Sequence, residues 1–209
     1  MLQHRARSAR NLLAFSVLAA LAVTACSSSP DATDGETDPT GTTDEAASAL
    51  TRQSAVSRAD AWVGVKLHYC QAPNHARDFD SACAHVCNRH DNPQWNPYRS
   101  DCSGLVSWAW GLPAPGRTTL GFAPYQTDIT HTIEASALEE GDAVNNRDHV
   151  MLFKRWVVKD RSAVFIEEPG CSSATPYAHE VTTAVSISGT SIHVVENGMT
   201  FTAIRYRKI

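Results

Sequence analysis

The sequence predicts an α+β fold in which N-terminal helices come first and a C-terminal antiparallel β-sheet follows. Apolar residues recur at helical spacing between residues 49 and 69, and again from residue 102 to residue 110. From residue 149 onward the chain is instead rich in β-branched and aromatic residues, with polar turns between apolar runs. The strands expected there are 149–158, 163–168, 181–188 and 200–207, and before them a turn at 137–143 leads into a further strand.

The first 25 residues have the pattern of an export signal. A basic segment, 1–10, precedes an apolar run of 12 residues, 12–23, which is too short for an ordinary membrane-spanning helix. The run ends in Val23-Thr24-Ala25-Cys26, which resembles the bacterial lipobox, whose cysteine carries a lipid once the signal is cleaved. We therefore expect a lipoprotein signal peptide at 1–25 and lipidation of Cys26, with an ordinary secretory signal as the alternative.

Residues 26–48 predict a disordered acidic tether between the membrane and a folded domain. The segment is rich in Ser, Thr and Asp and, apart from its prolines, has no aliphatic side chain larger than that of Ala. The expected location is the bacterial cell envelope, at the outer membrane or periplasmic face in a Gram-negative host, because Ser27 rather than Asp follows Cys26. From Thr51 onward 15 basic and 16 acidic residues nearly balance, so no nucleic-acid partner is predicted.

The folded domain is expected at 49–209, with an irregular, cysteine-rich insertion at about 70–97. Cysteines of exported proteins tend to pair, so we expect disulfides here rather than zinc, which stays the alternative. If Cys26 is lipidated and Cys102 is reactive, four cysteines remain, and they allow three pairings. These four are Cys70, Cys83, Cys87 and Cys171.

Residues 99–110 predict a buried helix with a cysteine in its first turn. Ser100 or Asp101 can cap the exposed N–H groups of that turn, and apolar residues follow from Leu105 on. A thiol at a helix N-terminus lies at the positive end of the helix dipole, which favours the nucleophilic thiolate. Cys102 is therefore the candidate nucleophile, and a structural or disulfide-bonded cysteine is the alternative interpretation.

A cysteine hydrolase also needs an imidazole that exchanges a proton with the thiol and a polar group that orients the imidazole. His149 is the candidate base, because it begins an apolar strand directly after the polar segment 145–148. A histidine with a purely structural role is the alternative. The next strand offers Glu167 and Glu168 as the orienting carboxylate, and we prefer Glu167.

Three motifs, in this order along the chain, resemble the NlpC-type cell-wall peptidase family, and the likeness covers roughly residues 56–209. It implies a papain-like fold in which the N-terminal helices, including the catalytic Cys helix, pack on the C-terminal antiparallel sheet. It also implies cleavage of the γ-D-glutamyl–diamino-acid bond in peptidoglycan stem peptides. The motifs are Asp101-Cys102-Ser103-Gly104-Leu105-Val106-Ser107, Leu138-Glu139-Glu140-Gly141-Asp142-Ala143 and His149-Val150-Met151-Leu152-Phe153.

The resemblance assigns roles to individual residues of this chain. Cys102 becomes the nucleophile, and His149 becomes the general base and then the acid for the leaving amine. The third residue of the family is usually His, Asn or Gln, so the glutamates of this chain depart from the pattern. Tyr69 takes the place of a tyrosine near the cysteine that assists substrate or oxyanion binding. We assign Asp101 and Ser103, which flank the nucleophile, to substrate binding.

The predicted function is therefore that of a lipid-anchored, monomeric cysteine endopeptidase that acts on peptidoglycan without a metal or organic cofactor. One alternative keeps the Cys–His pair but makes the protein an amidase acting on another murein bond or on a related acyl substrate. A second alternative is a non-catalytic, murein-binding lipoprotein. A disulfide on Cys102, for example to Cys171, would favour this second alternative.

Overall fold

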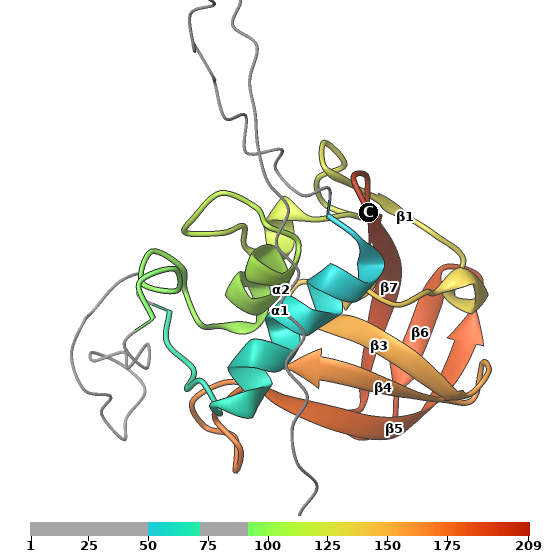
Figure 1. Ribbon diagram of the computed structural model, residues 1–209. Coiled ribbons are helices and arrows are strands. Elements are labelled where there is room, and N and C mark those ends of the chain that lie inside the picture. Colours follow the sequence, from blue (N-terminus) through green and yellow to red (C-terminus); the bar gives the residue numbers. More distant parts are fainter. Residues whose placement is uncertain (1–49, 72–91) are drawn as a thin grey trace, which may run out of the picture. The chain divides into compact units, whose positions relative to one another are not determined.

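Figure 1 shows the computed structural model, which describes residues 50–71 and 92–209. The predicted signal peptide, the lipid site Cys26 and the tether lie outside the described residues, as do Cys83 and Cys87. The helices are α1 (Arg52–Gly64), α2 (Cys102–Ala109) and the 3-10 helices η1 (Thr119–Gly121) and η2 (Ala135–Ala137). The strands are β1 (Thr130–Thr132), β2 (Ala143–Asn145), β3 (Val150–Val158), β4 (Ser162–Glu167), β5 (His179–Ser188), β6 (Ser191–Val194) and β7 (Met199–Tyr206). Every helix in the described ranges is too short or too polar to cross a membrane.

Helix α1 begins at a capping box and buries one face. The Thr51 hydroxyl accepts a 3.0 Å hydrogen bond from the Ser54 N–H, and the Ser54 hydroxyl accepts one of 2.9 Å from the Thr51 N–H. Small side chains on the buried face let the helix approach its neighbours closely, and one tryptophan fills the remaining space. The buried residues are Ala55, Val56, Ala59 and Trp62.

Helix α1 ends at Gly64, well before the predicted end at residue 69. Lys66 adopts a left-handed backbone conformation with φ 51°, which turns the chain out of the helix. The Leu67 N–H then donates to the Trp62 carbonyl and the Lys66 N–H to the Val63 carbonyl, the two bonds of a Schellman cap. The chain beyond this cap runs extended towards the start of α2.

Strand β7 closes the sheet into a barrel. Ile204 pairs with β1 and with β2, and Thr202 pairs with β2 and with β6. Because a strand has only two edges, β2 must occupy one edge of β7, and β1 and β6 must share the other. The order β7-β2-β3-β4-β5-β6 therefore returns to β7 as a closed, six-stranded antiparallel barrel, and β1 extends it beside β7.

Both faces of β3 are buried, which explains why its sequence is a continuous apolar run. Met151 and Phe153 belong to an apolar cluster to which all six barrel strands contribute, so this cluster fills the barrel. Val150 and Leu152 belong to a second cluster, which they share with α1 and α2. The two helices pack against each other on one side of the barrel, where α2 contacts β3 and α1 contacts β4 and β5 (Figure 1).

The predicted papain-like α+β fold, with N-terminal helices that include the Cys102 helix packed on a C-terminal antiparallel sheet, is wrong. The protein is instead mostly sheet, with two short α-helices of 13 and 8 residues in the described ranges. The error arises because β1 and β6 were not recognised as strands, and without β6 the sheet has two open edges. An open sheet needs helices to cover its apolar face, whereas a closed barrel covers that face with its own strands.

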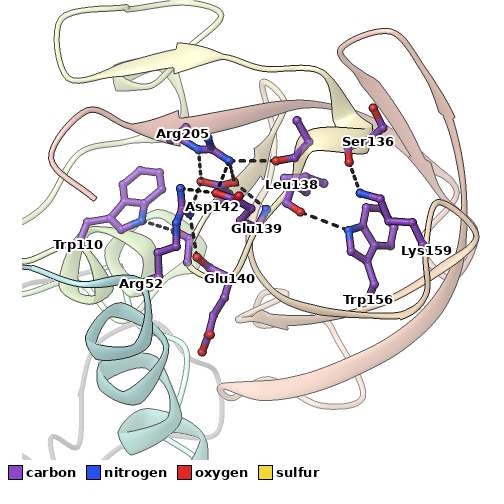
Figure 2. Close-up of polar contacts among 12 residues, drawn as sticks. Arg52, Trp110, Ser136, Leu138, Glu139, Glu140, Asp142, Trp156, Lys159 and Arg205 are labelled. Carbon is purple, nitrogen blue, oxygen red and sulfur yellow. Dashed lines mark hydrogen bonds and ion pairs between the residues drawn. The ribbon is translucent and has the colours of Figure 1, made fainter.

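A buried carboxylate, Asp142, joins α1 to the barrel (Figure 2). Arg205 of β7 donates to its two oxygens at 2.9 and 2.8 Å, and Arg52 of α1 donates to one of them at 3.0 Å. The preceding Gly141 has φ 83°, and a Cβ there would lie 2.8 Å from the Ile209 side chain. The Gly-Asp pair of the motif at 138–143 therefore has a structural role in this fold.

Candidate active site

Cys102 is the first residue of α2, and Asp101 is the N-cap of that helix. One oxygen of the Asp101 carboxylate accepts a 2.6 Å hydrogen bond from the Gly104 N–H and one of 3.0 Å from the Ser103 hydroxyl. The other oxygen pairs with the Arg99 guanidinium at 3.1 Å. These contacts fix the first turn of α2 and, with it, the position of the Cys102 sulfur.

The two residues assigned to substrate binding, Asp101 and Ser103, are only 6% and 4% exposed. Their polar groups bond within the cap of α2, where the Asp101 carboxylate accepts from the Ser103 hydroxyl and from the Gly104 N–H. Gly104 is required in the same turn, because a Cβ there would lie 1.9 Å from the Arg99 carbonyl oxygen. The motif at 101–104 is therefore explained by the construction of the nucleophile helix.

The extended segment that follows α1 brings Tyr69 to Cys102. On one side of this segment Cys70 exchanges two backbone hydrogen bonds with Ser100, of 2.8 and 2.9 Å. On the other side the Tyr69 N–H donates to the Pro176 carbonyl at 3.0 Å. The early end of α1 is thus what allows Tyr69 to reach the site. The hydroxyl of Ser100, the other predicted cap, bonds to a carbonyl of this segment instead.

The Tyr69 hydroxyl is half-buried beside the cysteine, and its pKa is raised to about 12. Burial is the largest cause, and the negative charges of Cys102, Asp101 and Glu168 act in the same direction. A 3.0 Å hydrogen bond donated by Gln71 lowers the pKa and offsets part of this rise. Tyr69 therefore keeps its proton at physiological pH and can donate a hydrogen bond.

The turn between β2 and β3 positions His149. The Asn146 side-chain oxygen accepts hydrogen bonds from the N–H groups of Asp148 and His149, at 2.9 and 2.8 Å. The Asn146 N–H in turn donates to the His149 carbonyl at 2.9 Å. The ring of Phe201 packs edge-on against the imidazole, with 6.2 Å between ring centroids. His149 is therefore held by its backbone and by its ring, and it is 7% exposed.

His149 lies between Cys102 and Glu167. Its Nε2 is 2.7 Å from Oε2 of Glu167, the last residue of β4. Cys102 is its other partner, and it raises the His149 pKa both as a hydrogen-bonding group and as a nearby charge. Because Nε2 faces Glu167, Nδ1 is the ring nitrogen that is left for the thiol. The structure thus brings together the three residues that the sequence analysis assigned as nucleophile, base and orienting carboxylate.

The pKa of His149 is raised from 6.5 to about 9 by its two partners. Burial is the largest single influence and lowers the pKa, but the hydrogen bonds and negative charges of Cys102 and Glu167 together outweigh it. His149 is therefore protonated at neutral pH.

The two glutamates that the sequence left open have different surroundings. Glu167 lies against His149, whereas Glu168 is fully buried and its charge acts on Tyr69. Successive side chains along an extended chain point to opposite sides, which is why two neighbouring glutamates face different groups. The geometry thus selects Glu167 as the residue that orients the imidazole.

The cysteines differ in their chemical state. Cys70 and Cys171 are disulfide-bonded, and Cys102 is a free thiol. The disulfide on Cys102 that would favour a non-catalytic protein is therefore not found. Within residues 50–71 and 92–209, no three His, Cys, Asp or Glu side chains are grouped so that they could hold a metal ion.

Two further residues at the site, Asn146 and His179, were not predicted from the sequence. Asn146 holds the turn before His149, and an Asn in a polar stretch before a strand is a turn signal that could have identified it. His179 lies 3.6 Å from Glu167, with its Nε2 facing Oε1. It follows from the pairing of β4 with β5, in which Glu167 and His179 are register partners, and no local pattern marks it.

A comparison of the chain with protein-family models finds no match, and a comparison with curated proteins finds none either. The functional argument is therefore carried by the arrangement of the site itself, that is, by a nucleophile, a base, an orienting group and nearby hydrogen-bond donors.

Proposed function

We propose that this chain is a cysteine-dependent amide hydrolase, with Cys102 as the nucleophile and His149 as general base and acid. One observation carries the proposal: a single imidazole lies between a free thiol and a carboxylate, with His149 Nε2 2.7 Å from Glu167 Oε2. A thiol, an imidazole and a carboxylate can supply the nucleophile, the base and the orienting group that a cysteine hydrolase requires. The proposal rests on the site and not on the fold, because one fold can host many chemistries.

In the proposed reaction the Cys102 thiolate attacks the amide carbonyl carbon and forms a tetrahedral intermediate. His149 donates its proton to the leaving amine, the C–N bond breaks, and a thioester to Cys102 remains. The neutral His149 then takes a proton from water as the water oxygen attacks the thioester carbonyl. Collapse of the second intermediate releases the carboxylic acid and restores the thiolate and the protonated imidazole.

Two donors are available for the oxyanion of these intermediates. The Cys102 N–H belongs to the first turn of α2, whose N–H groups have no carbonyl partner within the helix. The Tyr69 hydroxyl, with a pKa of about 12, stays protonated throughout the working pH range. Donors that are already in place stabilise the developing charge without reorganisation during the reaction.

We propose peptidoglycan stem peptides as the substrate and the γ-D-glutamyl–diamino-acid bond as the bond that is cleaved. The support is the resemblance of three motifs to the NlpC-type family, which supply the nucleophile helix, the Asp142 junction and the His149 strand. The export signal supports the same substrate, because a lipid on Cys26 and a tether at 26–48 would hold a monomeric enzyme in the envelope, where murein lies. The chemistry proposed needs no metal or organic cofactor.

The test uses the purified full chain beside its Cys102→Ala variant, each incubated with muropeptides whose products are identified by mass spectrometry. The proposal expects cleavage between D-glutamate and the diamino acid, and its loss in the variant. His193→Ala is the matched control for His149→Ala, because His193 lies on β6 and its ring bonds to the Thr200 hydroxyl. The control is expected to keep the activity that His149→Ala loses.

Other outcomes separate the alternatives. Cleavage of a different murein bond, still dependent on Cys102, would identify an amidase and contradict the proposed bond. Absence of any cleavage, together with a Cys102 that does not react with iodoacetamide, would contradict the hydrolase and favour a murein-binding protein.

A further inference from the structure

Glu167 lies between two imidazoles. Its Oε2 is 2.7 Å from His149 Nε2, and its Oε1 is 3.6 Å from His179 Nε2. Glu167 ends β4 and His179 begins β5, and the two residues are register partners in the antiparallel pair. The carboxylate therefore presents one oxygen to each histidine.

The hydrogen bond at Nδ1 of His179 determines when Nε2 of the same ring carries a hydrogen. Nδ1 lies 2.9 Å from the Tyr177 carbonyl oxygen, and a carbonyl oxygen only accepts hydrogen bonds, so Nδ1 carries a hydrogen. Nε2 then carries a second hydrogen only when the ring is an imidazolium. In that state the ring faces the Glu167 carboxylate, 3.6 Å away, as the cation of an ion pair.

We infer that His179 is a positioning residue for the proposed reaction, because it holds Oε1 of Glu167 and so keeps Oε2 aligned on His149. Its effect on turnover rests on the proposed function, whereas its effect on the His149–Cys102 pair does not depend on any substrate. His179 touches neither the nucleophile nor a reacting atom in this scheme. It acts through Glu167, as outer partners of functional imidazoles commonly do.

The segment that carries His179 is itself anchored to the segment that carries Tyr69. The Ala178 N–H donates to the Leu67 carbonyl at 2.8 Å, and the Pro176 carbonyl accepts from the Tyr69 N–H at 3.0 Å. Tyr177 forms a bridge with His68 between these two bonds. One short backbone pairing therefore positions both the orienting pair, Glu167 and His179, and the tyrosine beside Cys102.

The charged groups around His179 come from several elements. Glu167 of β4 faces its Nε2, and beyond Glu167 lies His149 at the start of β3. Lys66, after α1, lies over the Tyr177 ring with its nitrogen 5.4 Å from the centroid. Glu180, the next residue of β5, pairs with Lys154 of β3, which also pairs with Asp60 of α1. Glu167 is therefore the acidic group in direct ion-pair range of the His179 ring within the described residues.

Two substitutions in the full chain separate the contact with Glu167 from the contact with Tyr177. In His179→Asn the amide nitrogen occupies the place of Nδ1, so it reaches the Tyr177 carbonyl but not Glu167. In His179→Gln the longer side chain carries its amide nitrogen to the place of Nε2, where it can donate to Glu167. The readout is the rate of Cys102 alkylation by iodoacetamide between about pH 5 and pH 10, which reports the His149–Cys102 pair without substrate.

The inference expects His179→Asn to slow Cys102 alkylation about two- to threefold at the acidic end of the profile, where the imidazolium form of His179 that pairs with Glu167 is most populated. It also expects a kcat about tenfold lower on muropeptides with KM unchanged, the usual scale for loss of an outer partner. His179→Gln is expected to retain most of the native profile, and His193→Asn is the matched control. An unchanged profile in His179→Asn would overturn the inference, and so would a His179→Gln variant as impaired as His179→Asn. If Cys102 of the native chain reacts with iodoacetamide but the chain cleaves no muropeptide, the proposed substrate is wrong. The alkylation rates of the variants still test the role of His179 in that case.

Discussion

His149 Nε2 and Glu167 Oε2 lie 2.7 Å apart, with 9% and 11% of their side chains exposed. His149 directly precedes β3, and Glu167 is the last residue of the neighbouring strand β4. A hydrogen bond to a carboxylate in such a buried place stabilises the imidazolium and fixes the orientation of the ring. The raised pKa of His149 therefore depends in part on Glu167.

Replacing Glu167 by Gln is expected to lower the pKa of His149 by about one unit from its value of about 9, because the negative charge is lost while the shape is kept. The measurement is an NMR titration of the His149 ring protons, with the alkaline inflection of Cys102 alkylation as a second readout. Glu180→Gln is the matched control, since Glu180 lies on β5 and pairs with Lys154. An unchanged His149 titration in Glu167→Gln would contradict the assignment of Glu167 as the orienting residue.

The raised pKa of His149 also predicts how stability depends on pH. The folded-state pKa of about 9 lies above the ordinary 6.5, so the contribution of His149 is complete below pH 6.5 and is lost as the pH rises through 9. The shift corresponds to at most about 3 kcal/mol. The free energy of urea unfolding should therefore fall more between about pH 6 and about pH 10 in the native chain than in His149→Gln. Equal losses in the two proteins would show that His149 is not the group responsible.

Gly104 is expected to be intolerant of any side chain, because a Cβ would lie 1.9 Å from the Arg99 carbonyl oxygen. Gly104→Ala must displace either α2 or the segment before it, and we expect a loss of several degrees in Tm together with slower alkylation of Cys102. Gly64→Ala is the matched control, since a Cβ there has no atom within 4 Å. A Gly104→Ala protein as stable as the control would contradict the packing described for the first turn of α2.

Asp142→Asn is expected to destabilise the protein by about 3 kcal/mol, because it leaves Arg52 and Arg205 without their buried counter-charge. Glu139, which is more exposed, compensates only in part. The measurement is the free energy of unfolding in urea, and the matched control is Asp128→Asn, which removes an exposed partner of Arg117. A loss no larger than that of the control would mean that the junction in Figure 2 is not important for stability.

The candidate site could be predicted from the sequence to a large extent, because its signals are local. A cap at Asp101 and apolar residues from Leu105 on indicate the nucleophile helix, and a polar turn before an apolar run indicates the start of the His149 strand. The choice between Glu167 and Glu168 needed the structure. It depends on which side of the extended chain faces His149.

The end of α1 shows the limit of such local signals. Helical spacing continues to residue 69, but the chain leaves the helix at Lys66 in a left-handed conformation, which a lysine adopts rarely. The bonds of the cap and the pairing of the next segment with Ser100 and Pro176 stabilise this turn. The position of Tyr69 therefore could not follow from the spacing of the apolar residues.

By itself, the sequence determined the helix that carries Cys102, the main strands and the residue types of the candidate site, since capping, helical spacing and strand composition act over a few residues. Only the tertiary structure decided that β6 pairs with β7, that the sheet closes into a barrel, and that Glu167 stands between His149 and His179. The physical reason is that strand pairing joins residues far apart in the chain. Its free energy depends on the packing of the whole barrel and on the entropy of closing long loops, which no short stretch of sequence encodes.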